Sequence, residues 1–159
     1  MGKLLLVLCL SIMFFSGCSQ ATRQETDEII GTEEVKYTLF TDKVNSLDGI
    51  TVTVKENTST TITIELYNTT SLEILYGNDY DLQIQIEDNW YSLPKILDNW
   101  AFPATACKLE ENSFSEWSVD WSSLYGELEK GYYRIVKSLI DYRVDYHIDY
   151  YIATEFDVE

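Results

Sequence analysis

The feature that most constrains the fold of this chain is a series of short runs in which apolar and polar residues alternate. The clearest runs lie at residues 50–54, 62–66 and 82–86. Alternation with a period of two puts successive side chains on opposite faces of a strand, so one face of each run is apolar. Clusters of turn-forming residues separate the runs, at spacings of about ten residues. This pattern predicts an all-β domain built as an antiparallel sandwich or barrel.

The C-terminal part of the chain predicts a long hairpin. Residues 132–140 alternate after a turn at 128–131, and a tetrapeptide that begins Asp-Tyr then occurs three times in succession from Asp141. As a strand, this repeat and the residues after it place mainly Tyr, Val and Ile on one face and charged residues, with His147, on the other. We therefore expect a last strand that pairs with residues 131–140, in a hairpin whose tip projects beyond the sandwich.

The other segments bring the expected total to about seven strands with little helix. A short first strand is expected at residues 35–39 and a further strand at 115–119. The stretch 91–111 holds both prolines of the chain and is less regular. We expect a long connection there, with a short helical turn.

Composition and charge narrow the function classes. Apolar residues make up 45% of the chain and charged residues 24%, which is typical of a globular protein rather than a disordered one. The 27 acidic and 11 basic residues give a net charge of −16, which would repel a phosphate backbone, so we expect no nucleic-acid partner. The single histidine leaves little from which to build a metal centre or a catalytic relay.

The N-terminus has the pattern of a secretion signal. One cation, Lys3, precedes a run of roughly a dozen apolar residues, too short for the ~20 residues of a membrane span. The run ends in Phe15-Ser16-Gly17-Cys18, which resembles the lipobox of bacterial lipoprotein signal peptides. The resemblance implies that Cys18 is linked to a diacylglycerol and becomes the N-terminus after cleavage. An ordinary secretory signal with an incidental cysteine is the alternative.

These patterns divide the chain into three parts. We expect a signal peptide at residues 1–17, the lipidated cysteine and a polar tether at 18–33, and the β domain at 34–159. After cleavage Cys107 is the one cysteine besides the lipidated one, so no disulfide is expected within the mature chain. We expect Cys107 to be a small buried hydrophobic residue rather than a reactive thiol. The acidic domain would stand off an anionic membrane surface while its lipid holds it there.

Several segments of the β domain match a known pattern. They are residues 62–68, 76–80, 89–91, 120–126, 128–137 and 153–156, and the most specific is the run Leu-x-x-Gly-x-Tyr-Arg-Ile-x-Lys at 128–137. Together they resemble a bacterial immunoglobulin-like domain family found in small lipoproteins, mostly of Gram-positive bacteria, over roughly residues 35–159. The resemblance implies a seven-stranded sandwich, no established reaction and no functional residue to carry over. It also implies that Tyr133 is a corner tyrosine whose hydroxyl holds a loop.

Candidate sites for chemistry are few. The chain has no nucleophile motif, no glycine-rich phosphate loop and no pairing of cysteine with histidine at ligand spacing, so we expect no catalysis. Asn78, Asp79 and Asp81 place oxygen ligands in an expected turn, where weak calcium binding is the one cofactor to consider. Ordinary turn chemistry explains the same residues.

Aromatic residues in and beside the irregular stretch indicate a second kind of site. Trp100 and Tyr91 are candidate ligand-binding residues, because exposed rings there could stack on sugars. A sandwich also needs large core residues, so we expect Trp117 and Trp90 in the core and leave Trp100 open between packing and binding.

The sequence therefore predicts a membrane-anchored, extracytoplasmic lipoprotein without catalysis, which binds or scaffolds at the cell envelope. Its expected partners are the membrane, through the lipid, and an envelope protein. The alternative is a surface module that binds a glycan or calcium. An exposed Trp100, or melting that depends on calcium, would favour that alternative.

Overall fold

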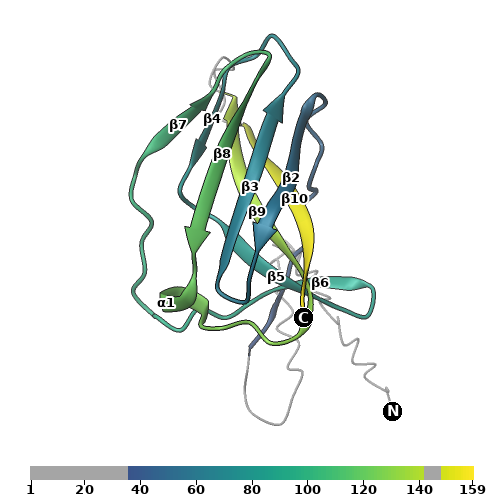
Figure 1. Cartoon of the computed structure of the whole chain (residues 1–159), viewed down its shortest axis with the longest axis vertical. Helices are drawn as coiled ribbons and strands as arrows, with labels where there is room; N and C mark the ends of the chain where they lie inside the picture. Colours follow the sequence, from purple (N-terminus) through teal and green to yellow (C-terminus); the bar gives the residue numbers. More distant parts are fainter. Residues whose placement is uncertain (1–35, 142–147) are drawn as a thin grey trace, which may run out of the picture.

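The computed structural model describes residues 36–141 and 148–159, which form two antiparallel β-sheets packed face to face (Figure 1). Within these residues there are ten strands and one short helix. They are β1 (Thr38–Leu39), β2 (Ile50–Asn57), β3 (Thr61–Asn68), β4 (Ile74–Gly77), β5 (Asp81–Ile86), β6 (Asn89–Ser92), β7 (Ala106–Leu109), β8 (Ser113–Asp120), α1 (Ser122–Tyr125), β9 (Gly131–Asp141) and β10 (Ile148–Val158).

The larger sheet is organised around β9. Its strands run in the order β1-β6-β5-β9-β4-β7, and β10 pairs with β9 along its whole length, from Gly131 opposite Val158 to Asp141 opposite Ile148. The smaller sheet contains β2, β3 and β8, with β3 in the middle. Because β4 and β5 both pair with β9, the two strands act as the halves of one interrupted strand.

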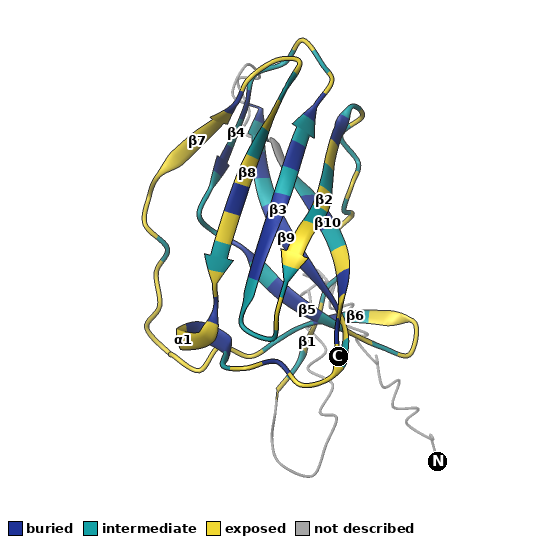
Figure 2. Ribbon diagram, viewed as in Figure 1, coloured by how far each residue is buried: buried dark blue, intermediate teal, exposed yellow. Residues whose placement is uncertain are grey.

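The apolar rows predicted by the alternation meet between the sheets. Ile62, Ile64 and Leu66 of β3 are buried, and across the sandwich so are Leu82 of β5 and Ile135 of β9. In Figure 2, β3 is largely buried, whereas β7 at the left edge is mainly exposed. Removal of apolar surface from water, at about 25 cal/mol per Å², holds the two sheets together.

The all-β sandwich is confirmed, with ten strands in the described residues rather than about seven. The additional strands β4, β6 and β7 have four residues each and lie where we expected turns or an irregular connection. A strand this short shows about two residues to each face, too few for alternation to be recognised. The helix was also misplaced, since α1 follows β8 instead of lying within 91–111.

The C-terminal hairpin is confirmed, because β10 pairs with β9 in the expected register range. Ile152, Phe156 and Val158 of β10 face the core, as expected for the apolar face of the last strand. The expected hairpin tip, with His147, lies outside the described residues. The predicted signal, Cys18 and the tether also lie outside them, and no helix of the described part is long and apolar enough to cross a membrane.

The corner tyrosine implied by the family resemblance is present. Tyr133, near the start of β9, donates its hydroxyl to the carbonyl of Glu129 at 2.9 Å. This bond holds the loop before β9 against the sheet.

The tryptophans are distributed differently from expectation. Trp117 is buried as predicted, but Trp90 is half-buried beneath the guanidinium of Arg134, 4.4 Å from its ring centre. Trp90 pairs with Gln85, on the face of β5 opposite the core, so its expected core position was wrong. The fully buried tryptophan is Trp121, whose indole N–H donates to a backbone carbonyl at 3.1 Å.

Cys107 is exposed, so the expectation of a buried cysteine was wrong. It lies in β7, at the end of the larger sheet, where Leu109 is the one buried residue of that strand. An edge strand is covered on fewer sides than a central one, which leaves this thiol accessible.

Candidate ligand-binding pocket

The pocket is built around the interruption between β4 and β5. The pairing of β4 with β9 reaches Leu139, and the pairing of β5 begins at Val136, so residues 137 and 138 of β9 face the break. At this break the backbone carbonyls of Gly77 and Asp79 accept hydrogen bonds from a side chain of β9 rather than from a strand.

That side chain is Lys137, which occupies the inward row of β9 between Ile135 and Leu139 and is 1% exposed. Its ammonium donates to the carbonyls of Gly77 and Asp79 at 2.9 and 3.0 Å. Burial lowers the pKa of Lys137 to about 8, although the nearby charge of Asp79 acts in the opposite direction. Carbonyl dipoles thus compensate only in part for the water that the ammonium has lost.

Trp117 of β8 lies over the buried ammonium. Lys137 Nζ is 3.7 Å from its ring centre, within the range of a cation–π contact. The indole N–H donates to Asn78 Oδ1 at 3.3 Å, and Asn78 Nδ2 donates to the Thr105 hydroxyl at 2.7 Å. Trp117 is therefore fixed both through its ring face and through its N–H.

Above Trp117 opens a pocket with a cavity volume of about 280 Å³. Four aromatic side chains contribute to its lining, namely Tyr80, Trp100, Phe102 and Trp117. Their rings form a continuous chain: Trp100 meets Phe102 at 6.0 Å, Phe102 meets Tyr80 at 5.2 Å, and Tyr80 meets Trp117 at 5.7 Å between ring centres. Ring pairs at these separations attract each other, which stabilises the arrangement of the aromatic wall.

The long connection between β6 and β7 supplies the outer part of the wall, where it runs past α1 (Figure 1). Ile96 N–H donates to the carbonyl of Leu124 in α1 at 2.8 Å and holds the connection there. Trp100 extends from this connection and is 41% exposed, while Phe102 behind it is half-buried. A large indole ring is therefore presented to solvent at the mouth of the pocket.

One carboxylate borders the aromatic wall. Asp120, at the end of β8, accepts a hydrogen bond from Ser122 N–H at 2.8 Å, and its bonds with Ser122 lower the pKa of this carboxyl. Burial, with the charge of Asp120 as a smaller cause, raises the pKa of Tyr80 to about 12. At neutral pH the pocket thus combines an ionised acceptor with neutral rings.

The two predicted ligand-binding residues, Trp100 and Tyr91, lie in different environments. Trp100 lies at the pocket, and its exposure is the property that a stacking platform requires. Tyr91 is only 4% exposed and lies within β6, so its prediction as a surface platform was wrong. Tyr91 belongs to a short strand that the sequence pattern did not reveal.

The three residues considered for calcium enter separate networks. Asn78 holds Trp117, the Asp79 carboxylate accepts from the Ser138 hydroxyl, and Asp81 accepts from Gln83 and Ser92 at 2.7 and 2.5 Å. Burial raises the pKa of Asp81, which disfavours its charged form. In the part of the chain that the structure describes, no group of three or more His, Cys, Asp or Glu side chains is placed to hold a metal. The calcium hypothesis stays a prediction.

The sequence analysis missed Lys137 and Asp120. Lys137 had a recognisable signal, because it is a cation within the inward row Tyr133, Ile135 and Leu139. A charge at such a position indicates either a break in the neighbouring strand or a partner within the core. Asp120 had no signal, since a carboxylate at a strand end is common.

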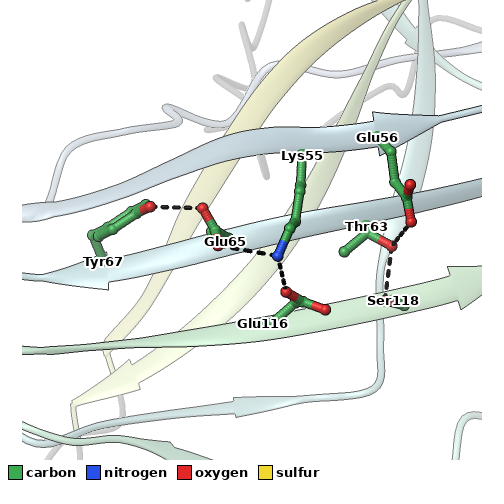
Figure 3. Close-up of polar contacts among 7 residues, drawn as sticks. All are labelled: Lys55, Glu56, Thr63, Glu65, Tyr67, Glu116 and Ser118. Atoms are coloured by element: carbon green, nitrogen blue, oxygen red, sulfur yellow. Dashed lines mark hydrogen bonds and ion pairs between the residues drawn. The ribbon is translucent and has the colours of Figure 1, made fainter.

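A second polar cluster covers the outer face of the smaller sheet (Figure 3). Glu65 of β3 and Glu116 of β8 lie directly opposite each other, and the ammonium of Lys55 lies 3.5 and 2.5 Å from their carboxylates. The hydroxyl of Tyr67 donates to Glu65 at 2.6 Å. Two like charges directly opposite each other destabilise a strand pair, and the positive charge of Lys55 between them reduces this repulsion. The role of Lys55 is therefore structural.

Comparison with known proteins identifies the family. Residues 46–157 match the family described as bacterial Ig-like domain. The chain belongs to the bacterial Ig-like domain family. No curated protein matches this family member.

Two solved structures show remote similarity to this Ig-like domain. A calcium-binding mutant of β-glucuronidase 2 from Bacteroides uniformis is 13% identical with a TM-score of 0.30, over 69% of this chain and 13% of that one. A protein from Archaeoglobus fulgidus is 11% identical with a TM-score of 0.25, over 72% of this chain and 98% of that one. This chain thus spans a small part of the enzyme, and at these TM-scores neither structure bears on its function.

Proposed function

We propose that this Ig-like protein is a lipid-anchored, non-catalytic binding module on the extracytoplasmic face of the cell membrane. The observation that carries the proposal is the open aromatic pocket at Trp100. Exposed rings held by a rigid sandwich suit recognition, because little conformational freedom is lost when a ligand binds.

The anchor rests on the sequence. The apolar run and the residues Ser16-Gly17-Cys18 support lipidation of Cys18, followed by a polar tether that separates the domain from the membrane. A tether of about fifteen residues reaches at most ~50 Å when extended. A lipid anchor and an acidic body together would keep the pocket accessible above the surface.

Anchoring is tested by metabolic labelling with an alkyne fatty acid and mass spectrometry of the N-terminus. The full-length chain should carry the label on Cys18 and lack residues 1–17. Cys18→Ala should be unlabelled and should leave the membrane fraction. An unlabelled wild-type chain that keeps its first residues would overturn the anchor.

Binding through the pocket is tested by photocrosslinking in cells. A photoreactive amino acid at position 97 replaces Leu97, an exposed residue of the connection that carries Trp100. The same group at position 114 is the matched control, because Phe114 is exposed on the outer face of the smaller sheet, opposite Tyr67. We expect a defined adduct, either an envelope protein or a glycan, from position 97 alone. Equal adducts from both positions would contradict a role for this pocket.

Of the ligands considered besides a protein, the structure favours a glycan over calcium. Trp100 is exposed at the pocket, whereas Asn78, Asp79 and Asp81 bond to different neighbours. A calcium titration monitored by thermal melting should therefore leave the melting temperature unchanged. A calcium-dependent rise would restore the cation site as the better explanation.

A further inference from the structure

We infer that the aromatic pocket takes a neutral saccharide, stacked on Trp100 and hydrogen-bonded through its hydroxyls to Asp120. The inference rests on the proposed binding function and specifies its ligand. It follows from the shape of the pocket, from its rings and from the charges around them.

The rings define an apolar surface for one face of a ligand. Trp100 is exposed and is held edge-on by Phe102, which is packed against the buried Tyr80. A sugar ring has one face of C–H groups that can lie on an indole, with hydroxyl groups around its edge. With about 280 Å³, the cavity lies at the small end of ligand sites, so it suits a single ring or the end of a chain.

The charges disfavour a cationic ligand within the pocket. Lys137 Nζ already lies 3.7 Å from the ring centre of Trp117. Lys95 Nζ lies 5.8 Å from the ring centre of Phe102. The net charge of −16 and the Asp120 carboxylate attract cations, but a cation stacked on this wall would meet two ammonium groups on the rings that should hold it.

An anionic ligand is disfavoured for a different reason. Asp120 is an exposed carboxylate at the pocket and is charged at neutral pH, and its bonds with Ser122 lower its pKa further. This charge and the net charge of the chain both repel an anion. A carboxylate has about four lone-pair sites, so Asp120 can still accept hydrogen bonds from neighbouring hydroxyls of a neutral sugar.

The test uses full-length lipidated protein in a polyoxyethylene detergent, which has no sugar head group to compete. A panel of neutral oligosaccharides of hexoses and N-acetylhexosamines is screened by saturation-transfer NMR. A de-acetylated amino-sugar oligomer provides the cationic probe and an oligogalacturonate the anionic one. We expect at least one neutral member to bind, and to bind more tightly than both charged probes.

Three variants assign the contacts for the best neutral probe. Trp100→Ala should weaken its binding by about tenfold or more, since a stacking contact of about 1.4 kcal/mol corresponds to that factor. Phe114→Ala removes another exposed aromatic and should leave the dissociation constant unchanged. Asp120→Asn is of similar size and should weaken the neutral probe while improving relative binding of the oligogalacturonate. If Asp120 had a purely structural role, Asp120→Asn would not change the affinity for the oligogalacturonate relative to the neutral probe.

The inference fails if no neutral oligosaccharide binds at millimolar concentration, if a charged probe binds best, or if Trp100→Ala binds as well as wild type. Capture of an envelope protein from position 97 with no saccharide binding would overturn this inference alone and leave the proposed function standing. If position 97 captures no partner and no saccharide binds, both this inference and the proposed binding function are overturned.

Discussion

Lys137 and Lys55 each hold an ammonium group among oxygen acceptors, one in the core of the sandwich and one on its outer face. Lys137 donates to two backbone carbonyls and lies under the ring of Trp117. Lys55 lies between the carboxylates of Glu65 and Glu116, in contact with solvent (Figure 3). The pKa of Lys137 falls to about 8 because of burial, whereas the pKa of Lys55 rises, chiefly through its hydrogen bond with Glu116.

The difference shows that both the charge of the acceptors and access to water set the pKa of a lysine. Neutral carbonyls and an aromatic ring do not replace full hydration of a buried charge. Two carboxylates at the surface favour the charged lysine at almost no desolvation cost, but each contact there is weak because water and salt screen it. The core cluster should therefore dominate stability, and the surface cluster should be sensitive to salt.

The largest expected effect comes from removing the ring above Lys137. Trp117→Ala should lower the free energy of unfolding by about 3–5 kcal/mol, because a large buried side chain is lost and the cavity at the pocket floor widens. Urea unfolding monitored by circular dichroism measures the loss. Trp90→Ala is the control, since Trp90 is half-buried on the opposite face of the larger sheet. An equal loss in the control would contradict the central position of Trp117.

Removing the buried ammonium comes next. Lys137→Met should lower the free energy of unfolding by about 2–4 kcal/mol, because the carbonyls of Gly77 and Asp79 lose their donor inside the protein. Lys55→Met, at the surface cluster, is the matched control and should cost much less. A Lys137→Met variant as stable as wild type would show that desolvation of the ammonium outweighs its bonds.

The two lysines should also respond to pH in opposite directions. The pKa of Lys137 is lower in the fold than the ordinary 10.5, so the unfolded chain holds this proton more firmly. Its contribution to stability is therefore smallest below about pH 8 and rises between pH 8 and 10.5. Lys55, with its pKa raised, contributes below pH 10.5 and loses that contribution as the pH rises through its folded pKa.

The measurement is the difference in unfolding free energy between wild type and each methionine variant at a series of pH values. Taking differences cancels the titration of the tyrosines, which is common to both proteins. From pH 8 upward, the unfolding free energy of the wild type should rise relative to that of Lys137→Met. A flat difference would mean that Lys137 keeps an ordinary pKa in the fold.

The smallest effect is expected at the surface cluster. Lys55→Ala leaves Glu65 opposite Glu116 and should lower the melting temperature by about 2 °C or less at low salt. At 1 M salt the difference should shrink, because the screening length of ~3 Å is then comparable to the separations between these charges. Glu116→Gln in the same background should restore part of the loss. A large drop in melting temperature that persists at high salt would contradict this expectation, since it would mean that the surface cluster stabilises the fold as strongly as a buried interaction.

The sequence analysis was most accurate where strands are long. β2, β3 and β5 each show a run of alternation, and β9 and β10 pair as the repeat and its flanking turn predicted. It was least accurate for β4, β6 and β7, because strands of four residues are held by their neighbours rather than by a pattern of their own. Tyr91 and Cys107 were misplaced for this reason, since each lies in one of these short strands.

The residues of the candidate pocket could be predicted only in part from the sequence. Trp100 could be named because large rings in an irregular stretch have few packing partners nearby in the chain. The other rings of the pocket, Tyr80 and Trp117, come from the break after β4 and from β8, and their approach depends on how the two sheets stack. The meeting of Asp120 with this wall follows from the same stacking.

The all-β class, the long C-terminal hairpin and the acidic character could be derived from the sequence, because alternation is a local property of the chain and net charge depends on composition alone. The break between β4 and β5 opposite Lys137, and the position of Trp117 over the ammonium there, follow from the packing of the two sheets and are not set by a local pattern of the chain. Folding brings residues about sixty positions apart into contact, as where the Lys137 side chain reaches the Gly77 carbonyl, and burial then lowers the pKa of the ammonium that is enclosed.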